Sequence, residues 1–334
     1  MNDFVKTDNE IVYHYAYKID RNKFRQFQGK RIPSIVLFQA KEFVPLEKIK
    51  IEVIDEPYDL HPDFRMYFEP IMEELKREFT RNRYNNPLAR FMDFSYDDKK
   101  GEGKLTIARS YFFYEWLVHL NPDRVFYPTT STRTFREIFD PILIHELNEN
   151  EAKLYNSPLP NTLGVNGLIL TSDGYVVVQR RSQSVVVEKR KFSVSFGGVF
   201  TWDFNKNNWQ KMIAEVISQN IEKELDFSID PDEIYEATYI MGIDRSLKYF
   251  GKPDIYVFTP LSETLKELEI KRNIEIEDFV FVKIASDLNQ LLEDPIKVRS
   301  RLTTFTDNLS GSISLHLKIA LDMLDNILVE VTSL

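Results

Sequence analysis

Acidic, basic and glycine residues that suit phosphate chemistry gather in the second half of the chain. A helix expected over residues 209–225 carries Glu222 and Glu224 near its end. Carboxylates grouped on a helix can hold Mg²⁺, which neutralises a pyrophosphate and activates water for attack on phosphorus. Upstream lie the pairs Gly197-Gly198 and Arg180-Arg181. A helix that follows glycines can turn its first N–H groups to a phosphate, and a guanidinium fork fits a diphosphate.

Each of these residues also has a plainer interpretation. Glu215, Glu222 and Lys223 fit a solvated helix face with ordinary i,i+4 pairing. Arg180 and Arg181 fit surface charge at the end of a strand, and the glycine pair fits a tight turn. Residue type alone therefore leaves the phosphate site and the plain surface open as alternatives.

The elements that must position these residues follow from apolar periodicity and turn residues. Thr171-Ser172-Asp173-Gly174 separates two apolar runs, which predicts a β-hairpin over residues 165–179. Apolar residues of the helix over 209–225 recur on one stripe, which predicts packing on a sheet. Further elements are expected as strands at residues 192–196, 255–259 and 279–282, and as a long amphipathic helix at residues 313–331. Residues 295–301 fit no element.

Residues 1–156 are expected to form a separate α+β N-terminal domain. Runs of β-branched and aromatic residues predict strands at residues 11–17, 34–38 and 104–108. Helical periodicity predicts helices over residues 64–81 and 140–154. Two prolines in Ser157-Pro158-Leu159-Pro160-Asn161 cannot continue the second helix, so a linker is expected there.

Composition bounds the class of protein. The chain has 334 residues, enough for two modest domains, and 43% are hydrophobic, as in globular proteins. A formal net charge of −9 argues against a general electrostatic grip on nucleic acid or an anionic membrane. The absence of cysteine excludes disulfides, thiolate metal sites and cysteine nucleophiles. The polar N-terminus and the lack of a long apolar run predict a soluble, cytoplasmic protein.

Other catalytic motifs are missing from the sequence. There is no Gly-x-Ser-x-Gly elbow, no Walker loop and no Rossmann fingerprint. The five histidines are scattered without the spacing of a metal site. An aromatic run at residues 111–116 could stack a base, although such runs are more typical of a domain core.

The order of the motifs resembles the Nudix fold. It runs from the hairpin end Gln179-Arg180-Arg181-Ser182 through Gly197-Gly198 and the helix to Met241-Gly242-Ile243-Asp244-Arg245 and Gly251-Lys252-Pro253. The resemblance implies an α/β fold over residues 157–334, a Nudix-like α/β/α sandwich with a mixed sheet. The α+β N-terminal domain would precede it, and the C-terminal amphipathic helix would follow. The expected ligand is a small molecule linked to a nucleoside diphosphate.

The family's catalytic motif is incomplete on this helix. Counting back from the helix end, Gln219 takes the arginine position, Asn220 and Lys223 take two of the glutamate positions, and Glu224 takes the last. Of the three usual acidic metal ligands only Glu224 remains. The resemblance therefore implies Glu224 as the ligand of one hydrated Mg²⁺, with Glu222 as a second catalytic candidate.

The flanking motifs are similar to those of Nudix hydrolases that cleave UDP-sugars and of their uncharacterised bacterial relatives. This likeness rests on Gly242-Ile243-Asp244-Arg245 and Gly251-Lys252-Pro253-Asp254, and more faintly on Asn86-Pro87-Leu88-Ala89-Arg90-Phe91. It implies that Arg245 and Lys252 lie near the phosphates. The expected ligand-binding set comprises Arg180, Arg181, Gly197, Gly198, Arg245 and Lys252.

Three functions fit the sequence. The favoured hypothesis is a binding module that holds a nucleoside diphosphate-linked ligand without efficient hydrolysis. The second is a Mg²⁺-dependent hydrolase of a nucleotide sugar or related compound. The third is a structural or partner-binding protein with a vestigial site. In that case the helix over residues 313–331 could form a homodimer interface, although it could equally pack on the chain's own sheet.

Overall fold

The computed structural model describes most of the chain. The described residues are 6–62, 64–65, 85–123, 133–149, 153–185, 188–202, 209–271, 273, 275–286, 288–309 and 312–333. Within these ranges, no helix has the length and apolar character needed to cross a membrane.

A nine-stranded mixed sheet forms the centre of the molecule. Its main path runs β1 (Phe24–Phe27), β2 (Lys30–Pro45), β10 (Tyr239–Ser246), β11 (Lys252–Pro260), β6 (Gly164–Leu170), β7 (Tyr175–Arg181) and β12 (Ile276–Lys283). Two short strands lie off this path, since β8 (Phe192–Ser193) pairs with β7 and β9 (Phe196–Val199) pairs with β6. Strands β11 and β6 are parallel, and the other pairs are antiparallel. The expected hairpin over residues 165–179 is confirmed as β6 and β7.

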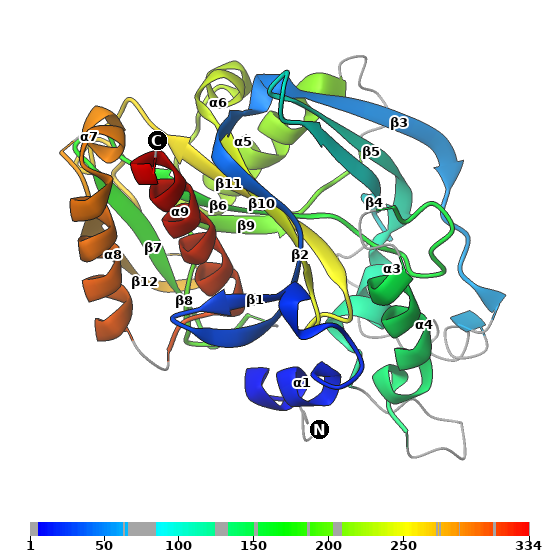
Figure 1. The fold of residues 1–334 in the computed structure, drawn as a ribbon. Helices are drawn as coiled ribbons and strands as arrows, with labels where there is room; N and C mark the ends of the chain where they lie inside the picture. Colours follow the sequence, from blue (N-terminus) through cyan, green and yellow to red (C-terminus); the bar gives the residue numbers. More distant parts are fainter. Residues whose placement is uncertain are drawn as a thin grey trace.

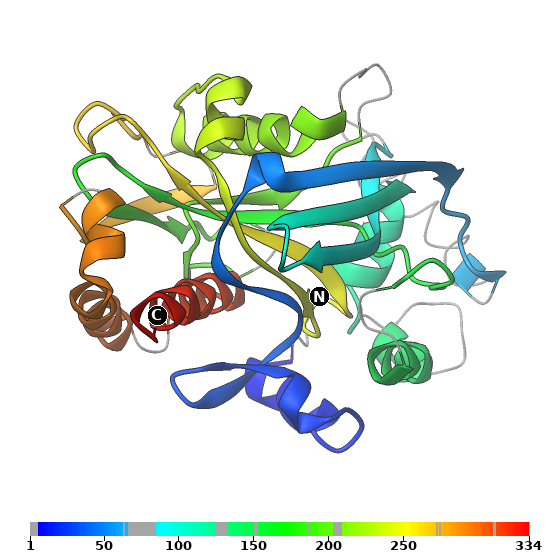
Figure 2. The same cartoon turned by 45° about the horizontal axis from the view of Figure 1, so that its top comes forward.

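Helices cover both faces of this sheet, which confirms the expected α/β/α sandwich. Figure 2 shows α5 (Met212–Leu225) and α6 (Pro231–Ala237) above the sheet, with α8 (Pro295–Asn308) and α9 (Leu315–Ser333) below it. The apolar stripe of α5 is buried: Ile213, Ile217, Ile221 and Leu225 are fully shielded from solvent. Each such side chain stabilises the fold by roughly 1.5–3 kcal/mol relative to an exposed one.

The C-terminal helix is also confirmed. Helix α9 packs against β2, β10 and β6 on the face opposite α5 (Figure 1). Its buried residues include Leu317, Leu321, Leu324 and Leu328. The short helix α7 (Leu288–Glu293) and then α8 precede it, so residues 295–301, which fitted no element, are helical.

The N-terminal half contributes both to this sheet and to a second one. Strands β3 (Ile49–Pro57), β5 (Glu102–Tyr111) and β4 (Pro87–Asp97) form a separate three-stranded sheet. Beside it in Figure 1 lie α3 (Phe112–Glu115), continued by a π-helical turn (Trp116–Leu120), and α4 (Phe135–Glu149). Strand β2 leaves this half and hydrogen-bonds along β10. Separate folding of residues 1–156 and 157–334 stays a prediction, and β1 and β2 join the two ranges in one sheet.

The strand expected at residues 11–17 is wrong, because this segment belongs to helix α1 (Asp8–Tyr15). Thr7 and Glu10 form a reciprocal capping box at its start. Ile11 and Tyr15 then share one face and are both buried. The expected helix at 140–154 begins earlier and ends earlier, as α4. The one expected at 64–81 lies almost wholly outside the described residues.

Candidate functional site

The main sheet forks between β6 and β7, and some of the motif residues lie at this fork. The two strands pair only at Ile169 with Val177 and at Leu170 with Val176. Beyond that point β6 pairs with β9, and β7 pairs with β8. Ser195, between β8 and β9, bridges the branches: its hydroxyl accepts from the Ile169 N–H and donates to the Val177 carbonyl. We call this region the fork.

Glu224 is buried at the fork. Only 3% of its surface is exposed, and its Oε2 accepts a hydrogen bond of 2.7 Å from Nε2 of Gln179 on β7. Burial raises the pKa of this carboxyl to about 7, against the lowering effect of the Arg181 charge and the Gln179 hydrogen bond. Near neutral pH Glu224 can therefore hold or release a proton.

Glu222 and Lys223 lie away from Glu224. Residues two positions apart on a helix do not face each other, and Glu222 is exposed. Lys223 is also exposed, and its Nζ lies 3.2 Å from Oε1 of Glu275. The structure thus brings one of the two catalytic candidates into the fork. The roles of Glu224 and Glu222 in catalysis stay predictions.

The glycine pair lies in strand β9 and forms no tight turn. A Cβ atom on Gly198 would come within 2.4 Å of Oδ1 of Asn220, and one on Gly197 within 2.5 Å of Oδ1 of Asn166. Both positions therefore lack room for a side chain. The side-chain amides of Asn220 on α5 and Asn166 on β6 therefore lie close to the β9 backbone. A phosphate-facing role for either glycine stays a prediction.

Arg180 and Arg181 end strand β7, at the end where β6 and β7 have separated. Alternation along the strand puts Arg181 on the same side as Gln179, and its charge acts on Glu224. Arg180 points to the other side: its guanidinium lies over the Phe192 ring at 5.8 Å, and its Nε lies 4.0 Å from Glu277. Both arginines are half-buried.

Arg245 lies at the end of β10, in contact with the N-terminal half. Its side chain is fully buried, with Nη2 3.0 Å from Oε2 of Glu146 on α4. Its Nε donates to the carbonyl of Gly251 at 2.9 Å, and Nη2 also donates to Asn161. These contacts neutralise Arg245 inside the protein. Its expected place near a phosphate stays a prediction.

Lys252 begins strand β11 and also forms internal ion pairs. Its Nζ lies 2.8 Å from Oε1 of Glu115 and 3.9 Å from Oδ1 of Asp254. Strand alternation puts Lys252 on the same face as Tyr256, which bonds to His316 of α9. Glu224 belongs to α5 on the opposite face. The structure does not bring these two candidates together, and a ligand-binding role for Lys252 stays a prediction.

A buried polar network at the start of α9 was not predicted from the sequence. Glu188 is 2% exposed in its side chain and lies 3.0 Å from Nζ of Lys248. Its carboxylate also accepts from the Leu315 N–H at the helix N-terminus. Although burial works to raise the pKa of Glu188, Lys248 and neighbouring cations lower it to about 2. Nothing in the sequence marked this pairing, because the partners lie far apart along the chain.

Gln179 was also missed as a site residue, although it carried a signal. It is a polar residue in the apolar strand β7, two positions before Arg181 and therefore on the same face. Its Oε1 is buried without a hydrogen-bond partner, while its Nε2 bonds to Glu224. A polar side chain inside an otherwise apolar strand is a reason to look for a buried partner.

The fork does not fit a Mg²⁺ site formed by the protein alone. Across the described parts of the chain, no group of three or more His, Cys, Asp or Glu side chains could hold a metal ion. Mg²⁺ prefers several oxygen ligands, usually with carboxylates among them. A single buried carboxyl bonded to an amide is a poor match. The assignment of Glu224 as a metal ligand stays a prediction.

Comparison with known proteins gave no matching family model and no matching curated protein. Two of the solved structures similar to this chain are described as Nudix proteins. One is Tm1382, a putative Nudix hydrolase, at 12% identity and TM-score 0.33, covering 77% of this chain and 96% of that one. A MutT protein from Methanosarcina mazei Go1 is 14% identical with TM-score 0.33, covering 49% and 92%.

A third similar structure is a bifunctional NMN adenylyltransferase/ADP ribose pyrophosphatase from Francisella tularensis, complexed with AMP and a manganese ion. It is 10% identical with TM-score 0.28, and the match covers 75% of this chain and 77% of that one. Superpositions with such low TM-scores carry no argument about the site.

Proposed function

We propose that this chain is a Nudix-like protein that binds a nucleoside diphosphate-linked ligand at the fork without hydrolysing it efficiently. One observation carries the second half of the proposal: Glu224 is the only buried carboxyl of the helix motif, and its pKa is raised to about 7. A carboxyl that is about half protonated at neutral pH and bonded to Gln179 is a weaker ligand for Mg²⁺ than a free carboxylate. Without that ion, little would neutralise a leaving phosphate or activate water.

The positive charge at the fork supports the proposal that a ligand with a diphosphate binds there. Arg180 and Arg181 end β7 and point to opposite sides of the strand. Arg181 lies on the side of Glu224, on which its charge acts. The diphosphate of a ligand would meet Arg181 there, whereas Arg245 and Lys252 each have a carboxylate within 3.0 Å. A guanidinium can bind a diphosphate through two parallel N–H···O bonds without a metal ion.

Calorimetric titration with a panel of nucleoside diphosphate derivatives tests this proposal. The panel contains UDP-glucose, ADP-ribose and NAD, each with and without Mg²⁺. We expect saturable binding of at least one compound, equally tight without Mg²⁺, and a loss of about tenfold or more in Arg181→Gln. That loss corresponds to about 1.4 kcal/mol, the size expected for a charge-assisted hydrogen bond.

The matched control is Lys41→Gln, which removes one positive charge at an exposed position of β2. We expect it to leave the affinity unchanged. Binding that requires Mg²⁺ and yields a nucleoside monophosphate would instead establish the hydrolase. If no compound of the panel binds, the proposal is wrong and the structural or partner-binding alternative gains.

A further inference from the structure

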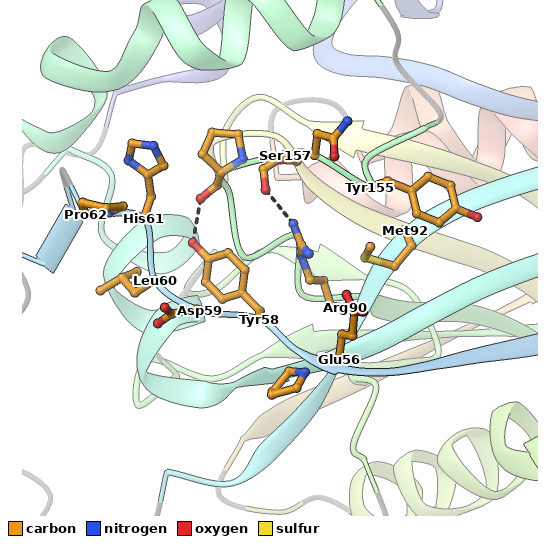
Figure 3. Close-up of a pocket in the computed structure, with 13 residues that line it drawn as sticks. Glu56, Tyr58, Asp59, Leu60, His61, Pro62, Arg90, Met92, Tyr155 and Ser157 are labelled. Carbon is orange, nitrogen blue, oxygen red and sulfur yellow. Dashed lines mark hydrogen bonds between the residues drawn. The ribbon is translucent and has the colours of Figure 1, made fainter.

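A pocket of about 430 Å³ lies outside the fork, beside the three-stranded sheet. The end of β3 and the residues that follow it form one wall, β4 forms the floor, and residues 155–158 form the opposite wall (Figure 3). This volume is within the range of small-molecule sites, roughly 300–1,000 Å³. The pocket includes Arg90 from the Asn86–Phe91 motif, whose purpose the fork does not explain.

Arg90 is the cation of this pocket and is 6% exposed. Its guanidinium lies over the Tyr58 ring, 4.8 Å from the ring centroid. Its Nη2 donates to the carbonyl oxygens of Ser157 at 2.6 Å and Leu159 at 3.2 Å, and Figure 3 shows the side chain directed at Ser157. Tyr58 in turn donates to the Pro158 carbonyl at 2.6 Å. These contacts fix the guanidinium in one orientation.

The charge of Arg90 is compensated only in part by the described residues. No described carboxylate forms an ion pair with it, and its Nε is buried without a hydrogen-bond partner. The carboxylate that acts on it, Glu146, pairs with Arg245 instead. Burial lowers the pKa of Arg90, as expected for a cation that has lost water without gaining a carboxylate. An uncompensated buried cation is costly unless an anion completes the site.

The acidic residues of the pocket limit which anion it can hold. Asp59 is paired with Arg65, Nη2 to Oδ2 at 2.6 Å, but Glu56 remains as a second charge on the lining. A polyanion such as a nucleic acid would be repelled by Glu56. A small molecule with a single anionic group fits better. The rest of that molecule would lie against Met92 and the exposed ring of Tyr155.

We propose that this pocket binds a small molecule through one anionic oxygen group, a carboxylate or a phosphate, held by the guanidinium of Arg90. The oxygen group supplies the counter-charge that the described carboxylates do not, and the aromatic and proline side chains of the pocket contact the remainder. This site is independent of the nucleotide proposed for the fork. One protein could therefore hold both ligands at once.

Anion titrations at constant ionic strength test the proposal. Sodium acetate and sodium phosphate are the two probes, chloride is the reference, and amide chemical shifts in NMR spectra report binding. We expect saturable shifts at the residues of the pocket with one probe stronger than the other, which tells carboxylate from phosphate. In Arg90→Met the affinity should fall at least tenfold, whereas Lys50→Gln, which removes an exposed charge from β3, should not change it.

A second variant keeps the test decisive if Arg90→Met does not fold. Glu56→Gln removes an exposed negative charge and leaves the Arg90 contacts in place, so it should tighten anion binding about threefold or more. The proposal is overturned if neither probe shifts the pocket residues of the natural chain. It is also overturned if a folded Arg90→Met binds as tightly as the natural chain, or if Glu56→Gln does not bind more tightly.

Discussion

The fork and the β10–β11 hairpin both bury ionisable side chains, but the partners of these side chains differ. The partner is a neutral amide at the fork and a carboxylate at the hairpin. At the fork, Glu224 has an amide partner, and burial raises its pKa to about 7. At the hairpin, Arg245 and Lys252 each have a carboxylate within 3.0 Å. Burial raises the pKa of Glu115 too, but there the Lys252 charge works against the rise. A buried ion pair also holds distant segments together.

The charges at the hairpin are paired within the protein, although Nη1 of Arg245 is buried there without a hydrogen-bond partner. The hairpin pairs link distant parts of the chain, because Glu146 belongs to α4 and Glu115 to α3. Their contribution is to the fold. At the fork, Oε1 of Gln179 is buried without a hydrogen-bond partner, and Arg181 ends the same strand. A ligand group that donates to this oxygen would complete its pairing.

The largest expected change in the free energy of unfolding comes from breaking the ion pair between Lys252 and Glu115. Lys252→Met leaves Glu115 buried without a counter-charge, and the loss of one partner of a buried pair costs about 3–5 kcal/mol. We expect urea unfolding at pH 7 to show a loss of this size. Adding Glu115→Gln should recover much of it. If Lys252→Met instead keeps full stability and loses nucleotide affinity, Lys252 is a ligand residue, as the motif resemblance implied.

A smaller, pH-dependent effect is expected at the fork. Glu224 has a raised pKa in the folded state, so folding takes up a proton, and stability falls as pH rises from about 4.5 to about 7. A shift of this size corresponds to about 3 kcal/mol above pH 7. Glu224→Gln removes the titration, so the variant should be more stable than the natural chain at pH 8 and little different at pH 4.5. Urea unfolding at the two pH values measures this, and an equal difference at both would contradict it.

The smallest effect is expected on the exposed side of the same helix. Lys223 and Glu275 form an ion pair with both side chains largely in solvent, 61% and 40% exposed. Such pairs contribute about 0–1 kcal/mol. Lys223→Ala should therefore shift the free energy of unfolding by less than about 1 kcal/mol and leave the pH dependence due to Glu224 in place. A large loss would mean that Lys223 acts inside the fork.

The local elements of the fold could be predicted where the sequence pattern is strong. An Asp-Gly turn between apolar runs predicted the β6–β7 hairpin, and a continuous apolar stripe predicted α5. Helix α1 was missed because its β-branched and aromatic residues are typical of a strand, and its start depends on the Thr7–Glu10 capping box. The entry of β2 into the main sheet was not predictable, because strand pairing over long separations leaves no local signal.

The candidate site could be predicted only in part, for a related reason. The position of Glu224 on its helix follows from periodicity, but its burial and its bond to Gln179 depend on where β7 lies. Arg245 and Lys252 carry the same charge and motif context as ligand-binding residues. Only their partners, Glu146 and Glu115, distinguish them, and those partners lie on other elements.

The most direct test of the central claim follows the fate of a bound nucleotide. The natural chain, in molar excess over whichever compound of the panel binds most tightly, is incubated with Mg²⁺ at pH 8, and products are separated by chromatography. We predict that the compound is recovered intact over many hours, by the natural chain and Glu224→Gln alike. Release of a nucleoside monophosphate by the natural chain, lost in Glu224→Gln, would contradict the account and establish a metal-dependent hydrolase.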